Sequence, residues 1–255
     1  NQERVLIVGD FDADGATSTA LAVTALKAFG FITVDYLVPN RFEQGYGLSV
    51  DIVEIAKASK PDLIITVDNG IASCEGVAKA NEYGIDVLIT DHHLSPDSLP
   101  NAVAIINPNQ KNCEFPSKNI AGVGVIFYVM LAFRRKLIEE NSFESNNIPS
   151  PNVATYLDLV ALGTVCDVVP LDKNNRIMVA LGLNRIKAGK CREGISALIN
   201  IGKRDASTLQ STVLGFVVGP RLNAAGRLDD MSLGIECLIT NSKDSALKLA
   251  KTLDE

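Results

Sequence analysis

Short runs of aliphatic residues alternate with longer helical patterns through the first part of the chain. The runs are rich in β-branched residues and show no apolar–polar alternation, which is typical of strands buried on both faces. They occupy residues 5–9, 34–38, 63–67, 86–90 and 102–107, and helices are predicted at about 17–29, 49–58 and 74–83. This order predicts βαβ units, and therefore a parallel sheet with right-handed crossovers.

A second pattern, made of helices, begins at about residue 122. Helices are predicted at 123–140, 153–165 and 176–186, with a polar loop at 142–152, and the chain ends in another helical pattern at 242–255. We therefore predict an α/β fold with a parallel sheet flanked by helices over about 1–120, followed by a helical part over about 121–240. Because the chain starts without Met and ends within a helical pattern, we expect a fragment of a longer protein.

Composition and charge narrow the classes of function. Hydrophobic residues make up 47% of the 255, enough for a sizeable core, whereas aromatic residues make up 5% and Trp is absent, which disfavours a binder based mainly on stacking. The net charge of −6 is unlike that of a typical DNA-binding module. A role on nucleic acid would therefore need local positive charge or further segments.

Cysteine usage and hydropathy predict the compartment. The five cysteines are odd in number and form no C-x-x-C pair, which is typical of a reduced protein rather than a disulfide framework. No signal peptide opens the chain, and its longest apolar stretch, 120–133, is too short to span a bilayer. We expect a cytoplasmic protein.

Aspartates follow three of the predicted strands. Asp10, Asp68 and Asp91 each come directly after an aliphatic run, and ligands of open α/β sheets bind outside the carboxyl ends of the strands. Any one of them could be a helix cap or a turn residue. Capping does not account for all three, because the first opens the stretch "GDFDADG", which adds Asp12 and Asp14. Carboxylates this crowded call for a compensating cation.

The segment that starts at Asp10 does not match the calcium-binding loop of an EF-hand. An EF-hand needs a glutamate at its twelfth position and follows a helix, whereas the twelfth residue here is Leu21 and a strand precedes the loop. His92 and His93, the only histidines, follow Asp91. Imidazole with carboxylates suits Mn²⁺ or another transition metal, and Mg²⁺ can substitute where carboxylates dominate.

Two further segments each allow two interpretations, and a third offers a weaker candidate. Asp167, in "LGTVCDVVPL", is either a helix-end cap or a site residue. The glycine-rich segment 215–230 is either an ordinary loop with solvated arginines or a phosphate clamp built on Arg221 and Arg227. The segment 40–48 offers Arg41 and a loop at 45–47, with a weaker signal.

These motifs resemble a known family. "GDFDADG", "TVDNG", "TDHH" and "GTVCDVVPL" are similar to the four motifs of the DHH phosphoesterase superfamily. Their surroundings "GDFDADGATSTAL", "RFEQGYGL", "INPNQ", "AGVGV" and "GPRLNAAGRL" resemble its RecJ branch, bacterial exonucleases that degrade single-stranded DNA from the 5′ end. The match runs to about Asp230, and the order and spacing of the motifs make it specific.

The resemblance implies a set of site residues. Two divalent cations, Mn²⁺ or Mg²⁺, would be held by Asp12, Asp14, Asp68, His92 and Asp167, with Asp14 and Asp68 shared between them. His93 would face the scissile phosphate, and Asp91 would orient a histidine from behind. Substrate phosphate would be contacted by Arg221, Asn223 and Arg227, with Arg41 as a weaker candidate.

One departure concerns the first motif. Pyrophosphatases of the superfamily carry a metal-binding histidine where this sequence has Val8. The first cation therefore loses a ligand, with Asp10 or water as the replacement, and this argues against a pyrophosphatase.

The function implied by the resemblance is release of 5′-mononucleotides from single-stranded DNA in repair and recombination, with a single-strand-binding protein and a helicase as partners. Residues 1–240 would form the DHH catalytic domain, and 241–255 would begin a connector to a DHHA1 domain. Two alternatives stay open. One is another DHH phosphodiesterase acting on short RNA or a cyclic dinucleotide, and the other is a non-enzymatic doubly wound module that binds a single Mg²⁺.

Overall fold

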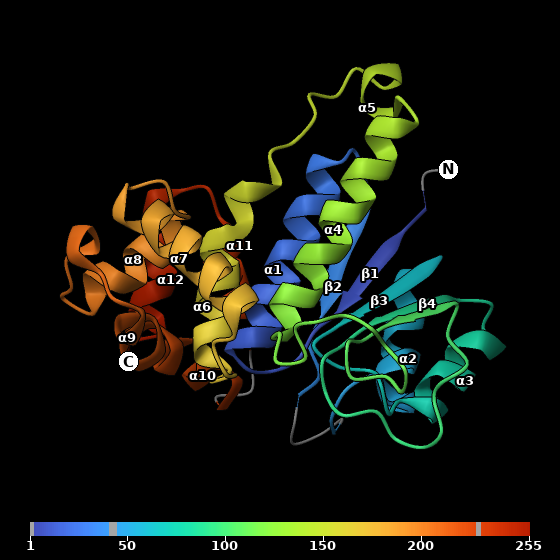
Figure 1. Ribbon diagram of the computed structural model, residues 1–255. Coiled ribbons are helices and arrows are strands. Elements are labelled where there is room, and N and C mark those ends of the chain that lie inside the picture. The colour runs from blue at the N-terminus through green and yellow to red at the C-terminus, as the bar shows by residue number, and fades with distance from the viewer. Residues whose placement is uncertain (1–2, 41–44, 228–230) are drawn as a thin grey trace.

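Five parallel strands form a single sheet in the order β2-β1-β3-β4-β5 (Figure 1). The structure is a computed structural model that describes residues 3–40, 45–227 and 231–255, without the side chains of 226 and 227. The strands are β1 (Val5–Val8), β2 (Val34–Leu37), β3 (Leu63–Val67), β4 (Asp86–Thr90) and β5 (Ala104–Ile106). The five predicted strands are confirmed, with β5 shorter than expected.

Helices make up most of the remaining chain. The longer ones are α1 (Ala13–Ala28), α2 (Val50–Ala56), α3 (Cys74–Glu82), α4 (Gly122–Glu139), α6 (Leu157–Cys166), α7 (Lys173–Lys187), α8 (Glu193–Ile201), α10 (Gly219–Arg227), α11 (Ser232–Ile239) and α12 (Lys243–Thr252). Short pieces are α5 (Ser142–Ser145), α9 (Ser211–Val213), the 3₁₀ turns Lys57–Ser59, Val153–Tyr156 and Ala206–Thr208, and a π-helical turn at Leu214–Val218. Within the described residues, no helix is long and apolar enough to cross a membrane.

The two faces of the sheet are covered by different helices. Ile7 and Ile65 face the larger core, which they share with α1, α4 and the helical half, whereas Leu6, Val8 and Ile64 face a smaller core under α2 and α3. In Figure 1, α1 and α4 lie side by side on one face, with α2 and α3 on the other. This confirms the predicted α/β sheet flanked by helices.

The helical half is attached to the sheet through α1. Helix α6 packs against α1, α4 and α7, and α12 packs against α8 and α11 (Figure 1). Helix α4 is therefore part of the layer that covers the sheet, although it lies beyond the predicted sequence boundary at about residue 120. The packing fixes the carboxyl end of α6 beside the amino end of α1.

Helices α8 and α11 were not predicted from the sequence, and two further segments differ from the prediction. Helix α1 begins at Ala13 rather than near residue 17, because the Asp12 side chain caps it by accepting the backbone N–H of Gly15 at 2.9 Å. The glycine-rich segment is helical up to Arg227, so its interpretation as an ordinary loop is wrong. Its glycines serve close packing, since a Cβ at Gly219 would lie 2.6 Å from Cys166 Sγ.

Candidate metal centre

The carboxyl ends of β1, β3 and β4 bring acidic side chains to one edge of the sheet. Asp10 and Asp12 follow β1, and one carboxylate oxygen from each lies within 4.8 Å of an oxygen of Asp68, which follows β3. Asp10 and Asp68 are buried. Val8, the position of the missing histidine, is packed in the smaller core. Asp10 offers a carboxylate oxygen to the group with Asp12 and Asp68, and its role as the replacement ligand stays a prediction.

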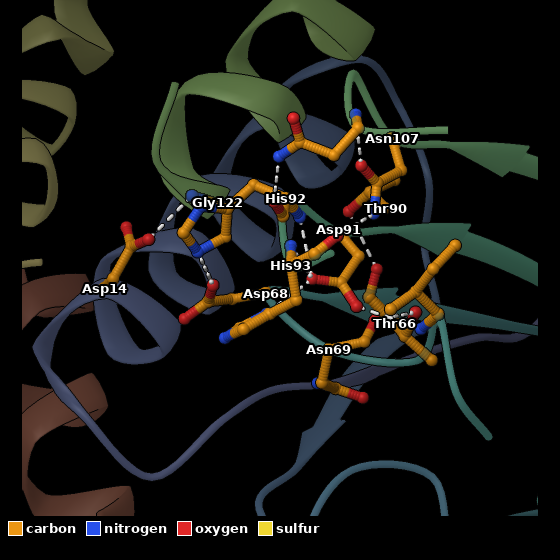
Figure 2. Close-up of polar contacts among 12 residues, drawn as sticks. Asp14, Thr66, Asp68, Asn69, Thr90, Asp91, His92, His93, Asn107 and Gly122 are labelled. Atoms are coloured by element: carbon orange, nitrogen blue, oxygen red, sulfur yellow. Dashed lines mark hydrogen bonds and ion pairs between the residues drawn. The ribbon is translucent and has the colours of Figure 1, made fainter. Parts of the chain in front are cut away.

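Asp14 is held by the amino terminus of α4. Its two carboxylate oxygens accept the backbone N–H groups of Gly122 at 2.6 Å and Val123 at 3.0 Å (Figure 2). Glycine is required at this contact, because a Cβ on Gly122 would lie 2.4 Å from Asp68 Oδ1. Gly163 of α6 approaches as closely, with a Cβ position 2.7 Å from Asp14 Oδ1. The centre is thus built against bare backbone from α4 and α6.

His92 lies between two carboxylates that come from distant parts of the chain. Its Nε2 is 3.1 Å from Asp68 Oδ1 and 3.6 Å from Asp167 Oδ2 (Figure 2 draws the first contact). Neither contact is aligned as a hydrogen bond, and both carboxylate oxygens are buried without a hydrogen-bond partner among the described residues. Buried carboxylate oxygens seldom stay unpaired, so these two atoms fit metal ligands.

Two groups of ligand atoms are arranged side by side. Asp14, His92 and Asp167 form one, and Asp10, Asp12 and Asp68 form the other, each with its ligand atoms within 4.8 Å of one another. Asp68 connects them, because it also groups with His92 and His93. Asp167 is the C-cap of α6 and also belongs to the first ligand group, so its role as a site residue stays a prediction. The donor set of carboxylates and one imidazole suits Mn²⁺ or Mg²⁺.

The crowded carboxylates have perturbed acidities. Burial, reinforced by neighbouring carboxylates, raises the pKa of Asp14 and of Asp68 well above the usual range. Burial and the Asp12 charge raise the pKa of Asp10 to about 7, and burial raises the pKa of Asp167. Burial lowers the pKa of His92, so the imidazole is neutral and able to bind a metal. Bound cations would remove the repulsion that causes the raised values.

These acidities predict how pH changes the stability of the metal-free chain. Aspartates with a raised pKa bind more protons in the folded than in the unfolded state between about pH 4 and pH 7, so the free energy of unfolding should fall as pH rises through this window. The lowered pKa of His92 opposes this only in part, because several aspartates act together. We expect the Tm in EDTA to be several degrees lower at pH 8 than at pH 5.

Thermal denaturation at several pH values tests this expectation. Added Mn²⁺ should restore the Tm at pH 8 and have little effect at pH 5. A metal-free Tm that rises from pH 5 to pH 8 would contradict the crowding of charge described here.

The side chain of His93 is oriented by its contact with Asp91. Asp91 Oδ1 lies 2.7 Å from His93 Nδ1 and also accepts the backbone N–H of His92 and of His93. Burial alone would raise the pKa of Asp91, but the hydrogen bonds from His93 and Ile71 outweigh it and lower that pKa. The hydrogen bond to Asp91 raises the pKa of His93. This leaves His93 Nε2 facing outward, 3.3 Å from the hydroxyl of Tyr46.

The structure gives less support to the residues predicted to contact substrate phosphate. Arg221 donates to Asp254 at 2.8 Å and to the Val217 carbonyl at 2.6 Å, so it is already paired. Asn223 does reach the centre, because its Oδ1 accepts the Ala13 N–H at 2.8 Å. Arg41 and the side chain of Arg227 lie outside the described residues. The phosphate contacts of all four stay predictions.

Several supporting residues were not identified from the sequence. Asn107 and Asn109 donate to the carbonyls of His93 and His92 at 2.9 and 2.5 Å, and Tyr46 caps His93. The motif "INPNQ" contains both asparagines, but nothing in its pattern shows which backbone groups they reach. The N–H groups of α4 that hold Asp14 leave no side-chain signal at all.

The motifs and this geometry agree with a comparison against protein families. Residues 4–164, more than half of the chain, match the model described as "DHH family, N-terminal domain". The chain belongs to the DHH family. The sheet, α1, α4 and most of α6 lie inside the matched region of this DHH domain, whereas Asp167 follows its end.

Two similar curated proteins carry the same name. The chain is 60% identical over 251 residues to the "Single-stranded-DNA-specific exonuclease RecJ" of Salmonella typhimurium, and 59% identical to that of Escherichia coli, covering 98% of this chain in both cases. It spans only 44% of the length of either relative. A crystal structure of exonuclease RecJ bound to manganese superposes with a TM-score of 0.84 at 32% identity, covering 99% of this chain and 60% of that one.

Proposed function

We propose that this chain is the catalytic core of a metal-dependent exonuclease that degrades single-stranded DNA from the 5′ end and releases 5′-mononucleotides. The observation that carries the proposal is the pair of adjacent ligand groups, Asp14/His92/Asp167 and Asp10/Asp12/Asp68, which Asp68 connects by also grouping with His92. Support comes from the exonuclease relatives at 59–60% identity and from the manganese-bound structure of the same fold. A role in DNA repair and recombination belongs to the same proposal.

The residues fit two divalent cations, Mn²⁺ or Mg²⁺. Asp14, His92 and Asp167 would hold one, and Asp12 and Asp10 the other, with Asp68 between them. Bound there, the cations would lower the pKa of a water molecule and stabilise the attacking and leaving oxygens of an in-line displacement. The four carboxylates of Asp12, Asp14, Asp68 and Asp167 would offset the charge of both cations, which leaves a nearly neutral site for a phosphodiester.

The protein groups then position the substrate. His93 would direct its Nε2, which lies 3.3 Å from the Tyr46 hydroxyl, toward the scissile phosphate, because Asp91 fixes its other nitrogen. With its pKa raised by Asp91, His93 can donate a hydrogen bond to a phosphate oxygen. Asn223 would contact substrate phosphate beside the start of α1. Arg221 could join it only by giving up its pairing with Asp254.

The wider setting is also a proposal. The reduced cysteines and the exonuclease relatives support a cytoplasmic enzyme. A single-strand-binding protein and a helicase are the partners implied by the family resemblance. Residues 241–255 are proposed to lead toward a DHHA1 domain, although α12 packs on α8 and α11.

The charge of this part of the chain predicts weak, distributive cleavage. Strand affinity comes largely from phosphate neutralisation, and a chain of net charge −6 with 5% aromatic residues offers few such contacts. The metal ligands all lie within residues 10–167, so hydrolysis itself should persist at a reduced rate. On a labelled single strand at low salt with Mn²⁺, we expect a ladder of partly shortened products, where the longer Salmonella relative runs to completion. Processivity equal to that of the longer relative would contradict this expectation.

A substrate panel tests the proposed function. With Mn²⁺, a 3′-labelled single strand should shorten from its 5′ end and yield 5′-mononucleotides, and the matching duplex should be spared. Faster hydrolysis of short RNA or of a cyclic dinucleotide would favour the other kind of DHH phosphodiesterase. An absence of hydrolysis in every metal tested would favour the non-enzymatic module.

A further inference from the structure

Three large apolar side chains are exposed to solvent on segments that adjoin the metal centre. Leu94 is 84% exposed, and Val168 and Phe216 are each 82% exposed, more than any other large hydrophobic side chain among the described residues. Leu94 directly follows His93 in the chain, and Val168 directly follows Asp167. We refer to Leu94, Val168 and Phe216 as the apolar rim.

Phe216 lies in a π-helical turn that packs against the end of α6, the helix that Asp167 follows. The turn Leu214–Val218 lies against the last turn of α6, since the Leu214 carbonyl is 3.6 Å from Cys166 Sγ. A Cβ on Gly215 would lie 3.3 Å from Val165 Cγ1. The residue after this contact is Phe216, and the residue after Cys166 is Asp167. π-helical turns of this kind occur frequently at functional sites.

Val168 is held in an unfavourable conformation as well as being exposed. Its φ is 62°, in the left-handed region, where a β-branched residue is a clear outlier. Glycine or asparagine would adopt this conformation more easily. The side chain gains nothing from burial in return, because it is 82% exposed. Strain of this kind is retained mainly at functional sites, so the valine side chain itself requires an explanation.

We propose that the apolar rim binds the nucleobases that flank the scissile phosphate, and so gives the site its preference for unpaired DNA. This inference rests on the proposed function. A phosphate at the metal centre places the bases of its two nucleotides within one nucleotide's length of the ligands, and Leu94 and Val168 directly follow the site residues His93 and Asp167.

The charge and the shape of the site support a base rather than a backbone contact. With two cations bound the centre is nearly neutral, so additional phosphates of the strand find little net attraction close to it. A base presents an uncharged face that packs on an apolar or aromatic side chain, and such stacks tolerate any sequence. In a duplex those faces are covered by neighbouring base pairs. The apolar rim is therefore expected to bind strands with unpaired terminal bases more tightly than the ends of a duplex.

Variants of the two best-placed rim residues provide the test. Phe216→Ala should raise the KM for a single-stranded oligonucleotide at least about fivefold, the low end for one base–aromatic stack, with kcat nearly unchanged, and Phe216→Tyr should restore it. Val168→Asn should also raise KM, yet raise the Tm of the metal-free chain because it relieves the left-handed strain. A merely structural role for Val168 would give no change in KM.

Ile32→Ala serves as the matched control. Ile32 is 76% exposed but precedes β2, at the amino edge of the sheet and opposite the metal centre. It should change neither KM nor Tm appreciably. Wild type should bind an oligonucleotide that lacks its two terminal bases about as weakly as Phe216→Ala binds the normal strand. Phe216→Ala should bind the oligonucleotide without those bases only slightly more weakly still.

The possible outcomes distinguish a failure of the apolar-rim proposal from a failure of the proposed function. If wild type hydrolyses DNA and the rim variants equal it in KM, the apolar rim has no role in base binding and the proposed function stands. If wild type fails to hydrolyse, the same comparison made on strand affinity by fluorescence anisotropy still decides the rim. If the rim variants lost the same affinity for normal strands and for strands without the two terminal bases, the apolar rim would contact another occupant, such as a further protein segment. That result would overturn the proposal.

Discussion

Asp68→Asn is expected to abolish hydrolysis while the chain stays folded. Asp68 belongs to two of the three ligand groups, and its Oδ1 is 3.1 Å from His92 Nε2, so loss of its charge removes the connection between two cations. Asparagine is the suitable substitution because Asp68 has a φ of 63°, which asparagine tolerates and alanine does not. A loss of more than about 100-fold in kcat, equivalent to about 2.7 kcal/mol of barrier, is expected.

The stability of the same variant provides an independent check. The burial and the neighbouring carboxylates that raise the pKa of Asp68 make its charge unfavourable in the metal-free fold. The Tm of Asp68→Asn in EDTA at pH 8 should therefore exceed that of wild type. Asp86→Asn, an exposed aspartate at the opposite end of β4, should change neither activity nor Tm. Retention of more than about a tenth of wild-type activity by Asp68→Asn would refute the bridging role.

His92→Ala and His93→Ala are expected to lower activity for different reasons. His92 has its Nε2 between Asp68 and Asp167, so its removal should weaken metal affinity, and high Mn²⁺ should restore part of the rate. His93 is held by Asp91 and points outward, so its removal should lower kcat about 100-fold with metal binding intact. The rate should be measured against Mn²⁺ concentration for both variants. Equal rescue of the two by metal would contradict the assigned roles.

The strands were predictable because they are buried on both faces. Residues such as Ile7 and Ile64 pack into cores on opposite sides of the sheet, which leaves uninterrupted aliphatic runs in the sequence. The start of α1 was missed because Asp12 both caps the helix and contributes to the cluster, so its polar surroundings looked like a loop. The helical conformation of the glycine-rich segment was not predicted, because its glycines allow contact with Cys166, which local propensity cannot show.

The candidate site, like the fold, was predictable from the sequence only in part. The carboxylates at the strand ends could be brought together from the sequence, because parallel strands present their carboxyl ends at one edge. The backbone N–H groups of Gly122 and Val123 that hold Asp14 could not, since they depend on how α4 is placed in space. The pairing of Arg221 with Asp254 likewise depends on the packing of the last helix.

The number of Mn²⁺ ions bound by each chain tests the two-metal centre most directly. Equilibrium titration of the metal-free protein, followed by calorimetry or native mass spectrometry, should give two Mn²⁺ per wild-type chain, and fewer than two for Asp68→Asn at the same free concentration. A single bound ion in wild type, unchanged in Asp68→Asn, would contradict the account.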